Sequence, residues 1–114
     1  GEDGVDLNFN YYEIDNLSAD LPNEFSIKQN FPNPFNPTTS IEFTLYQNDY
    51  IEVLVYDITG KLINVLVEKY YLEGTHFIQW DGKNQTGMQV PSGVYIYQIS
   101  NSKKMLSKKM TLLR

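Results

Sequence analysis

Residues 41–55 read IEFTLYQNDYIEVLV, and this stretch decides the fold class. Apolar side chains occupy every second position in the runs before and after the polar Asn48-Asp49 pair. A period of two is typical of a strand with one buried face. We therefore expect strands at Ile41–Leu45 and Ile51–Val55, joined by a tight hairpin turn at Asn48-Asp49.

The same alternation continues towards the C-terminus. Further strands are predicted at Lys61–Tyr71, His76–Trp80, Val94–Ile99 and Met105–Leu113. A helix over Leu62–Leu66 is the competing prediction, but the β-branched residues there favour a strand. With the run that begins at Phe25, the pattern predicts about seven short antiparallel strands in an all-β, immunoglobulin-like sandwich. Trp80 is expected in its core, with tyrosines on inner faces and rims.

Two polar stretches separate these runs. Asp57-Ile58-Thr59-Gly60 has the residues that a type I turn followed by a left-handed position requires. Asp81–Gly87 has a faint likeness to a calcium loop, but it has few carboxylates, and Ser92 stands where an EF-hand needs glutamate. We interpret Asp81–Gly87 as a β-hairpin loop whose glycines supply positive φ.

Residues 30–37 read NFPNPFNP, and three prolines exclude this segment from any central strand. We interpret it as an entry segment that crosses the rim of the sandwich. Phe31 and Phe35 are expected to pack as plugs, and the prolines to guard a sheet edge against pairing. The alternative interpretation is a polyproline-type docking surface.

Chemistry-bearing motifs are sparse. The chain has no cysteine, and its one histidine, His76, has no second ligand or nucleophile beside it in the pattern. No nucleophile elbow, phosphate loop or pair of catalytic carboxylates is recognisable. We therefore assign no catalytic residue, metal ligand or cofactor. The nine tyrosines leave a carbohydrate-binding or adhesive module open as an alternative function, because flat rings stack on sugars.

Charge is divided unevenly along the 114 residues. Residues 1–24 hold seven acids and no Lys or Arg, whereas residues 103–114 hold five Lys or Arg and no acid. We expect 1–24 to be an acidic linker or the end of a preceding cargo domain, and 25–114 to be the folded domain. Because the chain starts at Gly1 instead of Met, we interpret it as the C-terminal piece of a longer protein.

The overall charge also limits the partners. A formal net charge of −5 and a pI of about 4.7 argue against nucleic acid as a partner. No apolar run is long enough to predict a membrane-spanning helix. The terminal stretch from Lys103 to Arg114 alternates lysine pairs with apolar residues. It fits an edge strand with lysines on its solvent side, and it also fits an address tag that a receptor reads.

Five ordered blocks closely resemble the type A C-terminal sorting domain of the type IX (Por) secretion system. The same pattern is similar to the immunoglobulin-like domain of flagellar hook-capping proteins. A structural spacer or hook-cap-like assembly domain is therefore a third possible function. The blocks are Asn30–Thr39, Val55–Gly60, Trp80–Gly82, Ser92–Tyr95 and Lys108–Arg114.

The resemblance implies a non-catalytic sorting module that directs a folded cargo protein from the periplasm across the bacterial outer membrane, to be secreted or held at the cell surface. Its partners would be the covalently linked cargo, the translocon and a sortase-like peptidase that removes the module. By position, the signal residues are Gly93, Val94, Tyr95, Lys108, Lys109, Met110, Leu112 and Leu113. A receptor could add a strand at this edge, with the lysines attracting an acidic surface.

Overall fold

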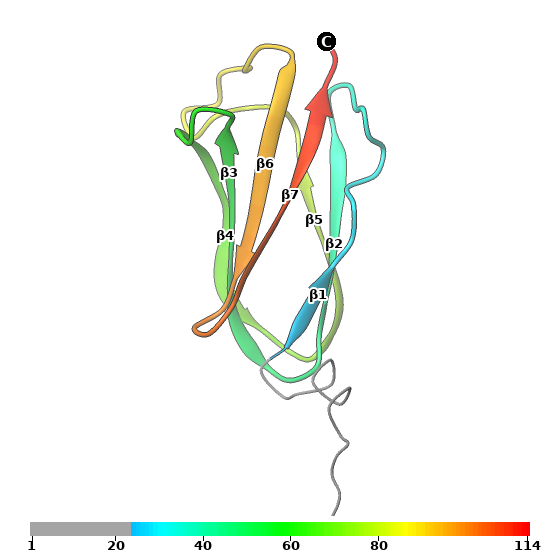
Figure 1. The fold of residues 1–114 in the computed structure, drawn as a ribbon, viewed down its shortest axis with the longest axis vertical. Coiled ribbons are helices and arrows are strands. Elements are labelled where there is room, and N and C mark those ends of the chain that lie inside the picture. The colour runs from blue at the N-terminus through cyan, green and yellow to red at the C-terminus, as the bar shows by residue number, and fades with distance from the viewer. Residues whose placement is uncertain (1–23) are drawn as a thin grey trace, which may run out of the picture.

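The computed structural model describes residues 24–114, which form two antiparallel sheets packed face to face (Figure 1). One sheet has the strand order β1-β2-β5 and the other β4-β3-β6-β7. The strands are β1 (Phe25–Ile27), β2 (Thr39–Leu45), β3 (Asp49–Asp57), β4 (Leu62–Tyr71), β5 (Gly74–Trp80), β6 (Gly93–Ser100) and β7 (Met105–Leu112). The prediction of a seven-strand, all-β sandwich is confirmed, and residues 62–66 belong to a strand.

The core lies between the sheets and follows the period of two. Ile41, Phe43 and Leu45 of β2 are buried, and the alternating residues Ile51, Val53 and Val55 of β3 face them from the other sheet. Trp80 and Tyr97 are the largest buried side chains, so the expected core position of Trp80 is confirmed. Burial of each Ile, Val, Leu or Phe side chain in this core contributes roughly 1.5–3 kcal/mol to folding.

The loop at Asn48-Asp49 does not form the predicted hairpin. β2 pairs with β1 and β5, whereas β3 pairs with β4 and β6, so the loop crosses from one sheet to the other. Its polar side chains tie it to other loops. Asn48 Oδ1 accepts the N–H of Glu73 at 2.9 Å, and Asp49 Oδ2 accepts the Asn101 amide at 2.8 Å.

The Asp57–Gly60 turn is confirmed and joins the paired strands β3 and β4. Asp57 Oδ1 accepts hydrogen bonds from Thr59 N, Thr59 Oγ1 and Lys61 N, and Gly60 has a φ of +88°. The Thr59 hydroxyl is the main cause that lowers the pKa of the Asp57 carboxyl. Asp57 and Gly60 therefore stabilise the turn in the way that the sequence predicts: the Asp side chain accepts backbone N–H groups, and the Gly supplies the positive φ.

Asp81–Gly87 leads from β5 in one sheet towards β6 in the other, so it does not connect a hairpin of two paired strands as predicted. Its glycines do supply positive φ, +75° at Gly82 and +86° at Gly87. Within the connection, Lys83 and Gln89 form an isolated antiparallel bridge around a turn at Asn84. The local turn chemistry was predictable, but the change of sheet was not.

Candidate functional site

The two predicted signal blocks lie side by side at one end of the sandwich. β6 and β7 are antiparallel neighbours, and their register places Gly93 opposite Leu112, Val94 opposite Thr111 and Tyr95 opposite Met110. Residues far apart in the sequence therefore form one two-stranded unit. β7 is the edge strand of its sheet, as expected, because β6 is the one strand of residues 24–114 that neighbours it in the sheet.

Three of the predicted signal residues belong to the core. Tyr95, Met110 and Leu112 are buried. The Tyr95 hydroxyl donates to Pro91 O at 2.7 Å, its ring packs edge-on against Trp80, and burial raises its pKa. Their side chains therefore pack in the core and stabilise the folded domain. The side chains of Val94, Lys109 and Leu113 are exposed and available for contact.

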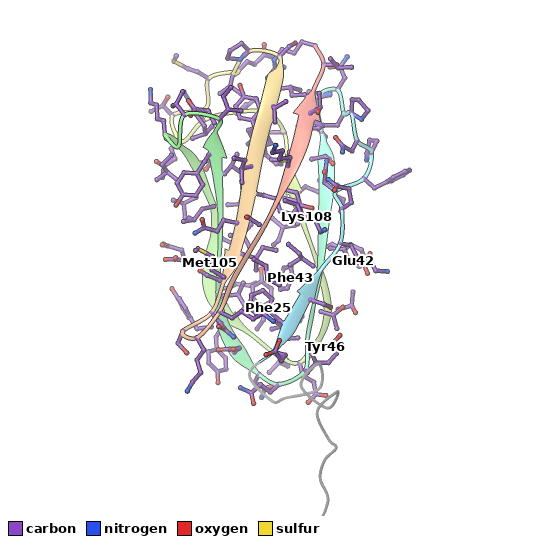
Figure 2. All side chains as sticks on the ribbon, in the orientation of Figure 1. Phe25, Glu42, Phe43, Tyr46, Met105 and Lys108 are labelled. Atoms are coloured by element: carbon purple, nitrogen blue, oxygen red, sulfur yellow. The ribbon has the colours of Figure 1, made fainter. Side chains whose placement is uncertain are left out.

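The lysines do not form one solvent-facing row, so that prediction is corrected. Lys108, labelled on β7 in Figure 2, lies opposite Tyr97 in the register. It shares the inward-facing side of β7 with Met110 and is half-buried there. Lys109 points to the outer face because side chains alternate along a strand. Lys104 Nζ pairs with Glu24. On β7 itself, Lys109 is the exposed lysine.

The end of β7 is covered by the proline-rich segment. Phe35 N donates to Thr111 O and Phe35 O accepts Leu113 N, both at 2.9 Å, in a parallel bridge. The side-chain oxygen of Asn33 accepts Thr111 N at 2.9 Å. The Gln29 amide donates to Lys109 O at 2.7 Å. We call residues Gln29–Phe35 the covering segment, because they occupy the outward backbone groups of the strand end.

A buried polar cluster fixes the start of the covering segment. Asn30 is buried, and its amide donates to Pro32 O and Thr39 Oγ1. The Tyr97 hydroxyl accepts Asn30 N and donates to Lys28 O at 2.6 Å. Burial raises the pKa of Tyr97 to about 12. Each buried polar group thus has a partner, which is what a stable buried cluster requires.

The two phenylalanines of the segment behave differently. Phe35 is 2% exposed and packs against Trp80 with ring centroids 5.7 Å apart, so its prediction as a plug is confirmed. Phe31 is 79% exposed, and that prediction is wrong. Its backbone pairs with Ser40, between the inward-facing Thr39 and Ile41, so its side chain projects outward. With Phe77 and polar neighbours, Phe31 lines a groove of about 350 Å³.

Arg114 fastens the chain end to neighbouring loops. Its backbone N donates to Ser92 Oγ at 2.8 Å, its Nε to Val90 O at 2.6 Å and its Nη2 to Gly82 O at 2.7 Å. A Cβ at Gly82 would meet Nη2 at 2.8 Å, so only glycine leaves this space open. The contacts of Gln29, Asn33 and Arg114 were not predicted from the sequence. The Asn-Pro pairs were a local signal, but their partners are some 80 residues away.

Within residues 24–114, no cluster of three or more His, Cys, Asp or Glu side chains could hold a metal ion. His76 is half-buried, its Nε2 donates to Leu72 O at 2.6 Å, and its ring lies 4.7 Å from that of Tyr71. These contacts give His76 a structural role. The described residues also include no helix that is long and apolar enough to cross a membrane.

Residues 29–112 match the family model described as a secretion system C-terminal sorting domain. The chain belongs to this family. The matched range holds both signal blocks except Leu113, together with the whole covering segment. A comparison with curated proteins finds no match.

Solved structures share the fold of this sorting domain. It is similar to part of dimeric latent PorU from Porphyromonas gingivalis, with a TM-score of 0.66 and 22% identity over 78% of this chain and 9% of that one. It is also similar to part of PorZ, described as an essential surface component of the type IX secretion system of P. gingivalis, with a TM-score of 0.51 and 23% identity over 77% and 11% of the two chains.

A third similar structure is FLGD from P. aeruginosa, with a TM-score of 0.50 and 27% identity over 65% of this chain and 58% of that one. The sorting domain thus spans about a tenth of PorU and PorZ and somewhat more than half of FLGD. Both predicted resemblances, to the sorting domains and to the hook-cap fold, are confirmed.

Proposed function

We propose that this sorting domain directs a folded cargo protein, attached on its N-terminal side, across the outer membrane by the type IX secretion system, so that the cargo is secreted or held at the cell surface. The route would pass through the periplasm. A translocon component would recognise the β6–β7 end, and a sortase-like peptidase would then remove the domain. The acidic residues 1–24 would supply the linker for that cleavage. The module itself would have no catalytic role.

One observation supports this proposal above the others. The two signal blocks from the family pattern, Gly93–Tyr95 and Lys108–Leu113, lie against each other at the edge of the sandwich. A partner that binds this edge could therefore contact both blocks at once. Of the eight signal residues, Val94, Lys109 and Leu113 have exposed side chains for such contact. Tyr95, Met110 and Leu112 would act by keeping the two strands in register.

The proposal is tested by export of a folded reporter in a host with this secretion system. The reporter carries the full chain at its C-terminus, the chain without residues 105–114, or the full chain with Trp80→Ala. Truncation should abolish export. The Trp80→Ala domain is destabilised by about 3–5 kcal/mol but keeps the sequence of its terminal strand. Its export shows how much loss of folding alone reduces export, apart from loss of the signal. Equal export of the full and truncated fusions would overturn the proposal.

Carbohydrate binding is the second candidate, and the exposed groove supports it. Phe31 and Phe77 flank Ser40 and Glu42, and Lys28 Nζ lies 3.4 Å from the Glu42 carboxylate. Aromatic faces beside adjacent donors and acceptors suit a sugar ring. A glycan array on the full chain should show binding that Phe31→Ala and Phe77→Ala remove. An array without binding would dismiss this candidate and leave the sorting proposal untouched.

A further inference from the structure

The outward backbone groups of β7 differ between its two ends. In an antiparallel pair, the N–H and C=O of alternate residues point away from the partner strand. The contacts of Thr111 with Asn33 and Phe35 show that the odd-numbered residues of β7 point outward. Lys109 O, bonded to Gln29, follows the same alternation. Met105 and Ser107 therefore also present their N–H and C=O to the outside.

These outward groups have no partner within residues 24–114. The covering segment reaches Lys109 O, Thr111 and Leu113, but no hydrogen bond joins it to Ser107 or Met105. Met105 is 61% exposed, and Ser107 is also exposed. The N–H of Lys109 completes a short row of free groups. We call residues Met105–Lys108 the open half of β7, and we call residues Lys109–Leu112 together with the adjoining Leu113 the covered half.

An unpaired row of backbone groups is a template for one more strand. The covering segment already demonstrates this on the covered half, where Phe35 pairs with β7 in parallel. An extended segment placed beside the open half would continue the same sheet. Backbone hydrogen bonds would supply affinity, and side chains at alternate positions would supply selectivity.

Charge decides which segment fits. Lys108 lies on the inward side of the open half, Lys109 lies on the outer side, and no acidic side chain of residues 24–114 makes an ion pair with either. Opposite charges directly across a strand pair stabilise it, and like charges destabilise it. A second copy of β7, placed antiparallel about Ser107, would set Lys108 opposite Leu106 and Lys109 opposite Met105, so it would bring two more lysines to this edge and no acid to pair with them. The charges therefore favour an acidic strand over self-pairing.

We propose that the open half of β7 binds an extended acidic segment of a partner protein by strand addition, with Met105, Ser107 and the Lys109 N–H as the backbone contacts. The proposal rests on the sorting function and deepens it by naming the docking position and the chemistry of the partner. It also moves the docking strand away from the chain end, because the covered half is already paired.

Ser107→Pro is the sharpest variant because it removes one outward N–H. Proline is tolerated on an edge strand where its missing N–H faces solvent. Ser107→Ala is the matched control, because it removes the hydroxyl and keeps the N–H. Both variants are made in the full chain, and thermal melting checks that each is folded. If Ser107→Pro does not fold, Lys109→Glu takes its place, since it reverses the outer charge and leaves the backbone intact.

The probes are two eight-residue peptides, one alternating valine with glutamate and one alternating valine with lysine. The glutamate peptide should slow hydrogen exchange at Met105, Ser107 and Lys109 by about tenfold. The lysine peptide should not. Ser107→Pro should remove the effect at Met105 and Lys109, and Lys109→Glu should weaken it. Unchanged exchange with both peptides would overturn strand addition, and equal slowing by both would overturn the acidic partner.

The export assay separates this inference from the sorting function. Ser107→Pro on the reporter fusion should lose export while Ser107→Ala retains it. If truncation of residues 105–114 abolishes export but folded Ser107→Pro exports normally, the sorting function stands and strand addition at the open half is wrong. If truncation has no effect, the sorting function itself fails.

Discussion

The covered and open halves of β7 share one strand and one neighbour, β6, but differ on their other side. The covered half meets Asn33 and Phe35, which take up its outward backbone groups. The open half begins where the covering segment has turned away to join β1, which pairs with β2 in the other sheet. The difference teaches that an edge strand can be both protected and available, at positions only two residues apart.

Phe35→Ala should change this comparison most. It removes the plug that packs against Trp80 and should lower the free energy of unfolding by about 3–5 kcal/mol. If the domain stays folded, amide exchange at Leu113 should rise towards that of Ser107. Denaturant unfolding measures the loss. The control is Phe31→Ala, whose exposed ring should cost less than about 0.5 kcal/mol. Equal losses at both positions would contradict the assignment of Phe35 as the anchor.

Alkaline pH should loosen the start of the covering segment next. The pKa of Tyr97 is about 12 in the folded domain and about 10 when unfolded, so both states hold the proton below pH 10. Between pH 10 and 12 the unfolded state loses it first, and stability should fall by about 2–3 kcal/mol. Unfolding curves at fixed pH steps measure this. The decline should be shallower in Tyr97→Phe, and an equal decline would assign it to other groups.

Asn33→Ala should have the smallest effect. It leaves Thr111 N without its side-chain acceptor, and the cost should be about 1 kcal/mol because the site is exposed to water. Hydrogen exchange at Thr111 should become faster, while exchange at Ser107 stays as it is. Asn36→Ala serves as the comparison, since Asn36 is also exposed and lies directly after the covering segment. Faster exchange at Ser107 in Asn33→Ala would mean that the two halves are not independent.

Local patterns predicted much of this fold. The period of two placed β2, β3 and most later strands, because alternation reflects a buried face that each strand carries by itself. Asp57–Gly60 was identified correctly because its hydrogen bonds lie within the turn. The family blocks predicted the signal positions, whose recognition role stays a prediction.

The pairing of segments that are distant in the sequence could not be predicted from local sequence patterns. Asn48-Asp49 has turn residues, but the choice between a hairpin and a crossing loop depends on whether β2 finds β5 as its partner. Phe31 and Phe35 are equally apolar, and only the bridge of Phe31 to Ser40 turns one of them outward. The inward position of Lys108 depends on the register of β7 with β6. Each of these outcomes is decided by contacts between residues far apart in sequence.

The parallel contact between Phe35 and the end of β7 also has a mechanical consequence. β1 lies in the half of the sandwich away from the C-terminus, so tension between the two acts along the strands (Figure 1). The hydrogen bonds that join Asn33 and Phe35 to Thr111 and Leu113 would then be loaded in shear and would have to break together. A load pulled by its terminal strand would therefore be resisted by these hydrogen bonds in addition to the β6–β7 ladder.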